Sequence, residues 1–410
     1  FSYDAPAGFC FGVFNGLSVT FVGIIGRKIG LDSKMLAILS ISAFVGLFLN
    51  VWMGHLADRG RKEGWVFWPS LVSRFLVALA LLRVSPWLYL GVMSAFNIVS
   101  TFGGPAYASI MRSNYSDRYR GEIMGYIRIL IQISTAISAA IAGAVMEAVP
   151  GSFRILFPLA AAFGMASSFL FRKIKVRPGR PRIQPPRGTP AEARATVPAH
   201  SGFMESLSTM TRDRLFMAYM AIYFVIGFPD KIVVPLEPIR FVDELGMNYA
   251  AAGLIQGTAP LVGALIGYLL YAKLADRSNP FVLLIVTTLL SSTRYLNTAL
   301  AALPVQLLPG AFLNGVSNAG WDLIPIFSLM LFAGRERLSL YFGFHSTLIG
   351  LRGFVGPILG VWLYSGLRMR ISTIYLLAFG IELVGAALLL RFYARFRELR
   401  TSQLGRAARG

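Results

Sequence analysis

The chain has 410 residues, of which 55% are hydrophobic and 14% charged, and its mean hydropathy is +0.62. Soluble domains usually carry about a quarter charged residues, so this composition excludes an ordinary soluble protein and indicates an integral membrane protein. The net charge of +20 comes from basic residues in short loops between apolar runs, where they set topology, so we expect no nucleic-acid site. One cysteine and three scattered histidines predict no disulfide, metal or cofactor.

Apolar runs long enough to cross a bilayer follow one another along the chain. About 20 apolar residues cross the hydrocarbon core as a helix, and the runs lack the alternation of barrel strands. We therefore predict an all-α integral membrane protein with roughly twelve transmembrane helices. The predicted spans lie near residues 5–26, 34–55, 65–83, 86–110, 122–146, 153–171, 214–236, 249–272, 280–302, 306–332, 338–364 and 371–391.

A segment rich in arginine and proline separates the sixth and seventh spans and is unable to bury an apolar face. We expect four regions: an N-terminal six-helix half at 1–171, a basic linker at 172–213, a C-terminal six-helix half at 214–393 and a basic tail at 394–410. Residues 203–212 within the linker fit either a helix on the membrane surface or a solvated lead-in.

The loops on the side of the linker carry most of the basic residues. We count roughly 26 there against about 8 on the other side, and the positive-inside rule places the more basic side in the cytoplasm. Both termini are therefore predicted to be cytoplasmic. We expect a multi-pass protein of a bacterial inner membrane.

The two halves repeat each other in sequence. A Leu-Ala-Asp-Arg sequence follows both the second and the eighth span, so that Asp58 and Asp276 lie 218 positions apart, and Gly125 and Gly343 keep that offset. Two anchors at one offset indicate an internal duplication. The duplication predicts two pseudo-symmetric halves.

The spans, the basic linker and the segment Gly54-His55-Leu56-Ala57-Asp58-Arg59-Gly60-Arg61-Lys62 together resemble the major facilitator superfamily. Its members carry Gly-x-Leu-Ala-Asp-Arg-x-Gly-Arg-Lys between helices two and three, and Leu274–Arg277 is similar to a weaker second copy. The resemblance implies that helices one, four, seven and ten line a central cavity and that three, six, nine and twelve lie outside. The chain departs from drug:proton antiporters because its fifth span lacks their Gly-Pro motif.

The loop motif and its echo are candidates for a conformational latch at the cytoplasmic rim. An aspartate there can accept from backbone amides of the next helix, and the basic residues can hold carboxylates or helix C-termini. The alternative is a helix cap among ordinary positive-inside residues. The predicted latch comprises Gly54, Asp58, Arg59, Gly60, Arg61, Asp276 and Arg277.

Ionisable residues within spans are costly, so each should be paired, face water or serve function. Asp322 lies near the middle of the tenth span, and we predict that it carries the coupling proton or binds substrate. Arg352 of the eleventh span suits either an anionic substrate or the role of counter-ion to Asp322. We expect Arg294 and Glu382, on outer helices, to form a structural pair.

The seventh span carries Asp230 and Lys231 after Pro229. Adjacent helical side chains point about 100° apart, so we expect at least one of this pair to need another partner. Arg128 lies on a flanking helix, and Asn97 belongs to an uncharged polar stripe on the fourth span. The predicted substrate and ion pathway comprises Asp322, Asp230, Lys231, Arg352, Arg128, Asn97, Asn314, Asn318, Trp321 and Asn15.

These features predict a secondary active transporter that is not an enzyme. It would move a small solute by alternating access with a proton as the coupling ion, as a monomer in the lipid bilayer. Five intramembrane bases against three acids favour an anionic or zwitterionic solute. No Gly-x-x-x-x-Gly-Lys-Ser/Thr loop for ATP is present. The alternative is a transport-inactive relative that assembles or regulates another membrane complex.

Overall fold

The computed structural model of the chain describes residues 3–59, 62–79, 85–104, 106, 107, 110, 114, 120–174, 212–275, 278–329, 331, 332 and 338–407. Across these ranges the secondary structure is helical and no strand occurs, which confirms the expected all-α fold. The predicted latch residues Gly60, Arg61, Asp276 and Arg277 lie outside the described residues, as does segment 203–211. Gly54, Asp58 and Arg59 end a helix, and only their backbone is described.

The N-terminal half begins with a span that is broken near its far end. Its first helix stops at Leu17, a short 3-10 turn follows, and a second helix continues the same span to Lys28. The elements are α1 (Asp4–Leu17), η1 (Val19–Phe21), α2 (Val22–Lys28), α3 (Ser33–Arg59), α4 (Lys62–Leu79), α5 (Pro86–Thr101), α7 (Arg120–Ala148) and α8 (Phe153–Arg172).

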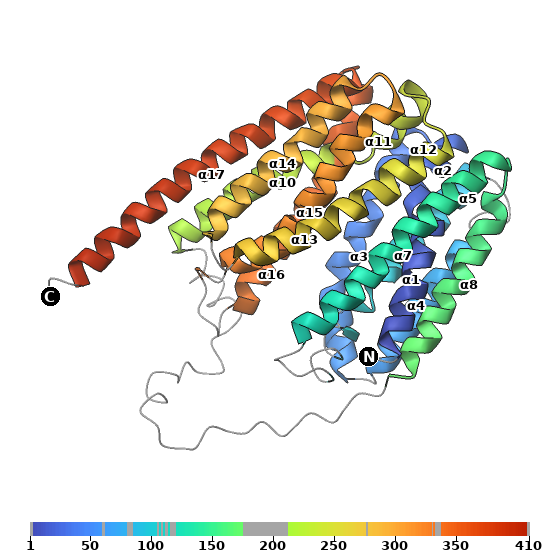
Figure 1. Ribbon diagram of the computed structural model, residues 1–410, viewed down its shortest axis with the longest axis horizontal. Helices are drawn as coiled ribbons and strands as arrows, with labels where there is room; N and C mark the ends of the chain where they lie inside the picture. Colours follow the sequence, from blue (N-terminus) through green and yellow to red (C-terminus); the bar gives the residue numbers. More distant parts are fainter. Residues whose placement is uncertain are drawn as a thin grey trace.

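The C-terminal half repeats this plan with more local irregularity, including π-helical turns in three places. Its final helix continues well past the predicted last span and projects beyond its neighbours (Figure 1). The elements are α10 (Arg214–Val233), α11 (Glu237–Ile239), η3 (Arg240–Glu244), α12 (Tyr249–Ala252), η4 (Gly253–Thr258), α13 (Ala259–Ala275), α14 (Pro280–Leu300), η5 (Pro304–Leu307), α15 (Leu308–Leu329), α16 (Leu338–Val361), η6 (Trp362–Gly366) and α17 (Ile371–Ala407).

The helices occupy the predicted spans. Within the described residues, seven helical stretches are long and apolar enough to cross a membrane: 4–28, 125–148, 153–172, 214–233, 249–271, 344–366 and 371–398. Helices α3, α4, α5, α14 and α15 overlap the remaining predicted spans. Large apolar side chains such as Trp87 and Ile155 are more than two-thirds exposed, as expected for a surface that faces lipid.

Polar caps fix where several helices start. The Asp213 carboxylate accepts from the backbone amides of Leu215 and Phe216 at the start of α10. The Asn248 and Asp32 side chains each accept from one backbone amide, of Ala251 in α12 and of Met35 in α3. Such caps satisfy amides that the first helical turn leaves without partners.

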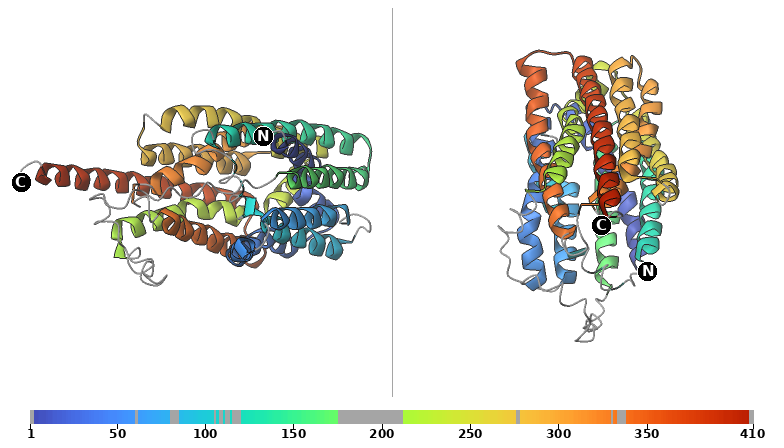
Figure 2. Two further views of the ribbon diagram at one scale, coloured as in Figure 1. Left: turned by 90° about the horizontal axis from the view of Figure 1, so that it is seen from below. Right: turned by 90° about the vertical axis from the view of Figure 1, so that its left-hand side faces the viewer.

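The two halves lie side by side as separate bundles (Figures 1 and 2). Helix α3 packs on α16, and α7 packs on α12, η4 and α13. Glycine permits the closest approach, because a Cβ at Gly143 would lie 2.6 Å from the Tyr249 carbonyl oxygen. The halves are therefore joined through these contacts near the end where α2, α11 and α12 lie.

Candidate transport site

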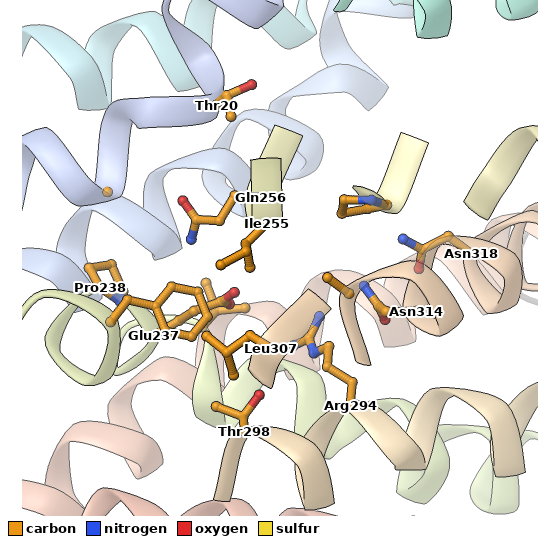
Figure 3. A pocket seen from close by; sticks show the side chains of 15 residues that line it. Thr20, Glu237, Pro238, Ile255, Gln256, Arg294, Thr298, Leu307, Asn314 and Asn318 are labelled. Atoms are coloured by element: carbon orange, nitrogen blue, oxygen red, sulfur yellow. The ribbon is translucent and has the colours of Figure 1, made fainter. Parts of the chain in front are cut away.

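A cavity of about 380 Å³ is lined by residues of η1, α2, α11, η3, η4, α13, α14, η5 and α15, and we call it the central pocket. Its volume lies within the range of small-molecule sites. Polar side chains from both halves line it, and Figure 3 shows them converging on one space. They are Thr20, Glu237, Gln256, Arg294, Asn314 and Asn318.

Arg294 provides the positive charge of the central pocket. Its Nη2 donates to Asp230 Oδ1 at 3.2 Å, and its side chain is 18% exposed. Asp230 therefore forms an ion pair with Arg294, and the Arg294 side chain also borders the central pocket. Arg294 lies on α14, the third long helix of its half, which the superfamily arrangement places outside the cavity, yet its side chain borders the central pocket.

Asp230 has two cationic partners, so the expectation that one of the neighbours Asp230 and Lys231 needs a further partner is met by Arg294. Lys231 Nζ lies 2.5 Å from Asp230 Oδ2, so these neighbours do neutralise each other despite the angle between their Cβ directions. The flexible lysine stem curls back to reach the carboxylate. Glu382 does not pair with Arg294, because it accepts a hydrogen bond from Ser291 at 2.6 Å.

Glu237 supplies a negative charge close to Arg294. Helix α10 ends at Val233, four residues after Pro229, and Glu237 opens the short helix α11 beside Pro238. Glu237 interacts electrostatically with Arg294 and lies next to Gln256. Gln256 belongs to a π-helical turn, a distortion that often marks functional sites. Figure 3 shows Arg294 rising from α14 between Glu237 and Asn314.

Asp322 lies outside the central pocket. Asn314 and Asn318 line the pocket, and Asp322, one turn beyond them on α15, is exposed and accepts a hydrogen bond from the Tyr268 hydroxyl. Trp321 does not join this polar row, because its ring packs edge-on against Tyr223 with centroids 5.6 Å apart. Within the described residues, Asp322 thus has one hydrogen-bond partner, the Tyr268 hydroxyl, and access to solvent.

Arg352 is buried and is not bonded to Asp322, so of the two alternatives for Arg352 the role of counter-ion to Asp322 is wrong. Its Nη1 donates to the Tyr223 carbonyl oxygen at 3.0 Å, and its Cζ lies 5.1 Å from the centre of the Tyr223 ring. A Cβ at Gly227 would overlap Arg352 Nη1. Glycine at that position makes room for the guanidinium between α10 and α16.

The predicted polar residues of the N-terminal half are dispersed. Asn97 donates to the Leu39 carbonyl and the Ser42 hydroxyl, so its amide joins α5 to α3 and does not line the central pocket. Asn15 is half-buried, and its backbone carbonyl accepts a hydrogen bond from the Thr20 hydroxyl. Arg128 is exposed and lines a different cavity within the N-terminal half.

Charged residues also join the halves beyond the central pocket. Arg27 Nε donates to both carboxylate oxygens of Asp243 at 2.8 and 3.0 Å. Lys28 Nζ lies 3.7 Å from the centre of the Tyr249 ring, and the Tyr249 amide donates to Glu147 at 3.0 Å. We call these five residues the clasp. The clasp closes the end of the molecule next to the central pocket.

A model of the Major Facilitator Superfamily matches residues 5–229 and 219–409. The chain belongs to this superfamily. It is therefore a member of a family of membrane transporters, as the loop motif and the internal repeat predicted.

Individual relatives of the superfamily are more distant. Multidrug resistance protein MdtH of Aeromonas hydrophila subsp. hydrophila is 26% identical over 152 residues, which cover 37% of this chain and 38% of that protein. MdtH of Aeromonas salmonicida is 25% identical over the same length. The matched stretch thus spans little more than a third of these relatives.

Solved structures of superfamily transporters share the fold over nearly the whole chain. A bacterial homologue of the human lysosomal transporter Spinster, in an inward-facing and occupied conformation, has a TM-score of 0.69 at 11% identity, with 96% of each chain covered. The nucleoside transporter NupG, solved as a point mutant, has a TM-score of 0.67 at 11% identity, covering 95% of this chain and all of that one. At these identities the likeness establishes the fold.

Proposed function

We propose that this protein is a secondary transporter that moves a small anionic or zwitterionic solute across a bacterial inner membrane by alternating access, coupled to protons. The observation that carries the proposal is the central pocket, where Arg294, held by Asp230, faces a space that Glu237 also borders. A guanidinium and a carboxylate on one small cavity suit a solute with both charges.

The amides around these charges would select for polar groups of the solute. Gln256, Asn314 and Asn318 each offer one acceptor and two donor hydrogens. A zwitterion could place its anionic group on Arg294 and its cationic group on Glu237. An anion without a cationic group would use Arg294 alone, so the proposal ranks zwitterions first.

Alternating access would require the clasp to open. The clasp joins the halves beside the central pocket, and under the predicted topology it lies on the outer face of the membrane. In this state a solute would reach the pocket from the cytoplasmic side. Separation of Arg27 from Asp243 would then expose the pocket to the outside.

Asp322 is our candidate for the coupling proton. Asp230 is engaged by Lys231 and Arg294 and so is held as a carboxylate, whereas Asp322 is exposed and, among the residues that the structure describes, bonded only to the Tyr268 hydroxyl. A carboxyl group with solvent access can exchange protons as the halves move. The protonation state of Asp322 would in turn alter its bond to Tyr268.

The test is uptake into proteoliposomes with and without an imposed pH gradient. The probes are radiolabelled amino acids, small organic acids and nucleosides, together with organic cations because of the multidrug relatives. We expect gradient-driven uptake of a zwitterionic or anionic probe, at least tenfold weaker apparent affinity in Arg294→Gln, and partial retention in Arg294→Lys.

The matched control is Arg154→Gln, which removes an exposed arginine outside the site. It should transport as the unmodified protein does. Uptake confined to cations, or uptake that Arg294→Gln leaves unchanged, would contradict the assignment of the pocket. A folded protein that moves none of the probes would favour the alternative of a transport-inactive regulator.

A further inference from the structure

The N-terminal half contains a second cavity, of about 430 Å³, which we call the N-half pocket. It is formed by α1, α4, α5, α7 and α8, all from one half, and shares no lining residue with the central pocket. Its walls are largely apolar, with a few polar groups at separate points. Residues that define it include Asp4, Phe11, Ser70, Arg74, Arg128 and Phe171.

Arg74 is a buried cation on this pocket, and within the described residues no carboxylate forms an ion pair with it. Its side chain is 7% exposed, and it makes no ion pair with any residue in the described part of the chain. Nη1 donates to the Ser73 hydroxyl at 2.7 Å, while Nε has no hydrogen-bond partner. Arg74 lies 12 residues into α4, at the middle of the span predicted at 65–83.

Aromatic rings compensate this charge only in part. The Arg74 Cζ lies 4.8 Å from the centre of the Phe14 ring and 5.2 Å from that of Phe11. A cation over a ring gains roughly 0.5–2 kcal/mol, whereas the desolvation penalty of a buried ion is several kcal/mol. A buried guanidinium with an unused donor therefore favours an anion at this end of the pocket.

The remainder of the pocket determines what kind of anion fits. Phe11 lies against Arg74, and Val66, Ile127 and Phe171 contribute apolar surface to the rest of the pocket. An inorganic anion would leave this surface in contact with water. An organic anion whose carboxylate is attached to an aromatic body would use the guanidinium and the apolar walls together.

We propose that the N-half pocket binds an aryl carboxylate, with Arg74 as its deep anion contact and the apolar side chains around Phe11 enclosing its ring. The proposal does not rest on the proposed transport function, because binding to this pocket is measurable without transport. A carboxylate at Arg74 would accept from Nε and complete the hydrogen bonding of the guanidinium.

The experiment measures binding of tritiated 1-naphthoate to the purified full-length chain in nanodiscs of phosphatidylcholine. We expect saturable binding that the neutral 1-naphthamide displaces at least tenfold less well than unlabelled 1-naphthoate. Arg74→Gln should weaken binding at least tenfold, and Arg74→Lys, which keeps the charge, should weaken it less. Equal displacement by the amide, or unchanged binding in Arg74→Gln, would overturn the proposal.

Two further variants locate the site and guard against misfolding. Arg294→Gln alters the central pocket and should leave naphthoate binding unchanged, so a loss there instead would assign the anion to the central pocket and refute the proposal. Ser70→Phe fills the N-half pocket one turn before Arg74 and keeps the arginine. It should abolish binding even if Arg74→Gln does not fold, and normal binding in Ser70→Phe would contradict the pocket.

Discussion

The two halves repeat one another in sequence, but the buried arginine on the third long helix has different partners in each half. Arg74 on α4 and Arg294 on α14 lie within two positions of the 218-residue offset, each on the third long helix of its half. Arg294 is paired with Asp230. Arg74 has no ion pair within the described residues. One arginine is thus part of a charge network, and the other is left for a ligand.

Substitution at the repeated positions explains this difference. At the offset of 218 residues, Asp230 corresponds to Gly12 and Glu382 to Gly164. A Cβ at Gly164 would overlap Arg74 Cγ, so the arginine stem crosses the space that a side chain at this position would need. The N-terminal half therefore lacks both acids and uses the space of one of them for Arg74.

Removal of the carboxylate from the paired half should have the largest effect. Asp230→Asn leaves Lys231 and Arg294 without their shared partner, and hydrogen bonds to charged groups are worth roughly 1.5–3 kcal/mol. We expect the free energy of unfolding to fall by about 2–3 kcal/mol, measured by thermal or denaturant unfolding in detergent. Asp213→Asn, which retains a good helix cap, is the control and should change stability little. Equal stability of Asp230→Asn and the unmodified protein would show that the network does not contribute.

Substitution by methionine should lower the free energy of unfolding at Arg294 but should not lower it at Arg74. Arg294→Met leaves Asp230 with one cation fewer and should destabilise the protein by about 1–2 kcal/mol. Arg74→Met removes a buried charge that has no carboxylate partner in the described part of the chain and should leave stability unchanged or raise it by about 1 kcal/mol. Unfolding of both variants in one detergent provides the measurement. A comparable loss in both would mean that Arg74 has a stabilising partner after all.

Breaking the contact between the halves should have a smaller effect. The Arg27–Asp243 ion pair is partly exposed, and such pairs contribute about 0.5 kcal/mol. Asp243→Asn should therefore shift the equilibrium between closed and open forms roughly twofold, measured as spin-label distances across the clasp. The adjacent variant Glu244→Gln breaks the Arg240–Glu244 pair within one half and should not shift these distances. Identical distances in both variants would exclude the clasp as a gate.

Periodicity and composition predicted the fold well because membrane helices need long apolar runs and satisfied backbones. The site was predicted only in part. Asn314 and Asn318 line the central pocket, but Arg294 was assigned to an outer helix, and Glu237 was not considered because it follows the end of a span. A residue's helix number does not reveal how far a long side chain reaches. The near-repeat of Arg74 and Arg294 at the offset of the two halves was the sequence signal that could have singled out both arginines.

Asp322→Asn should have the smallest effect on stability and a large effect on proton coupling. Asp322 is exposed and bonded to Tyr268, so Asp322→Asn should change the free energy of unfolding by less than about 0.5 kcal/mol. Its counterpart at the repeat offset is Gly104, so this carboxylate too belongs to only one half. If Asp322 carries the proton, the variant should lose accumulation driven by a pH gradient and keep solute exchange. Tyr268→Phe keeps the carboxylate and should retain coupling, with an altered pH dependence. Normal gradient-driven accumulation in Asp322→Asn would exclude Asp322 as the coupling group and leave the acids around Arg294 as the remaining candidates.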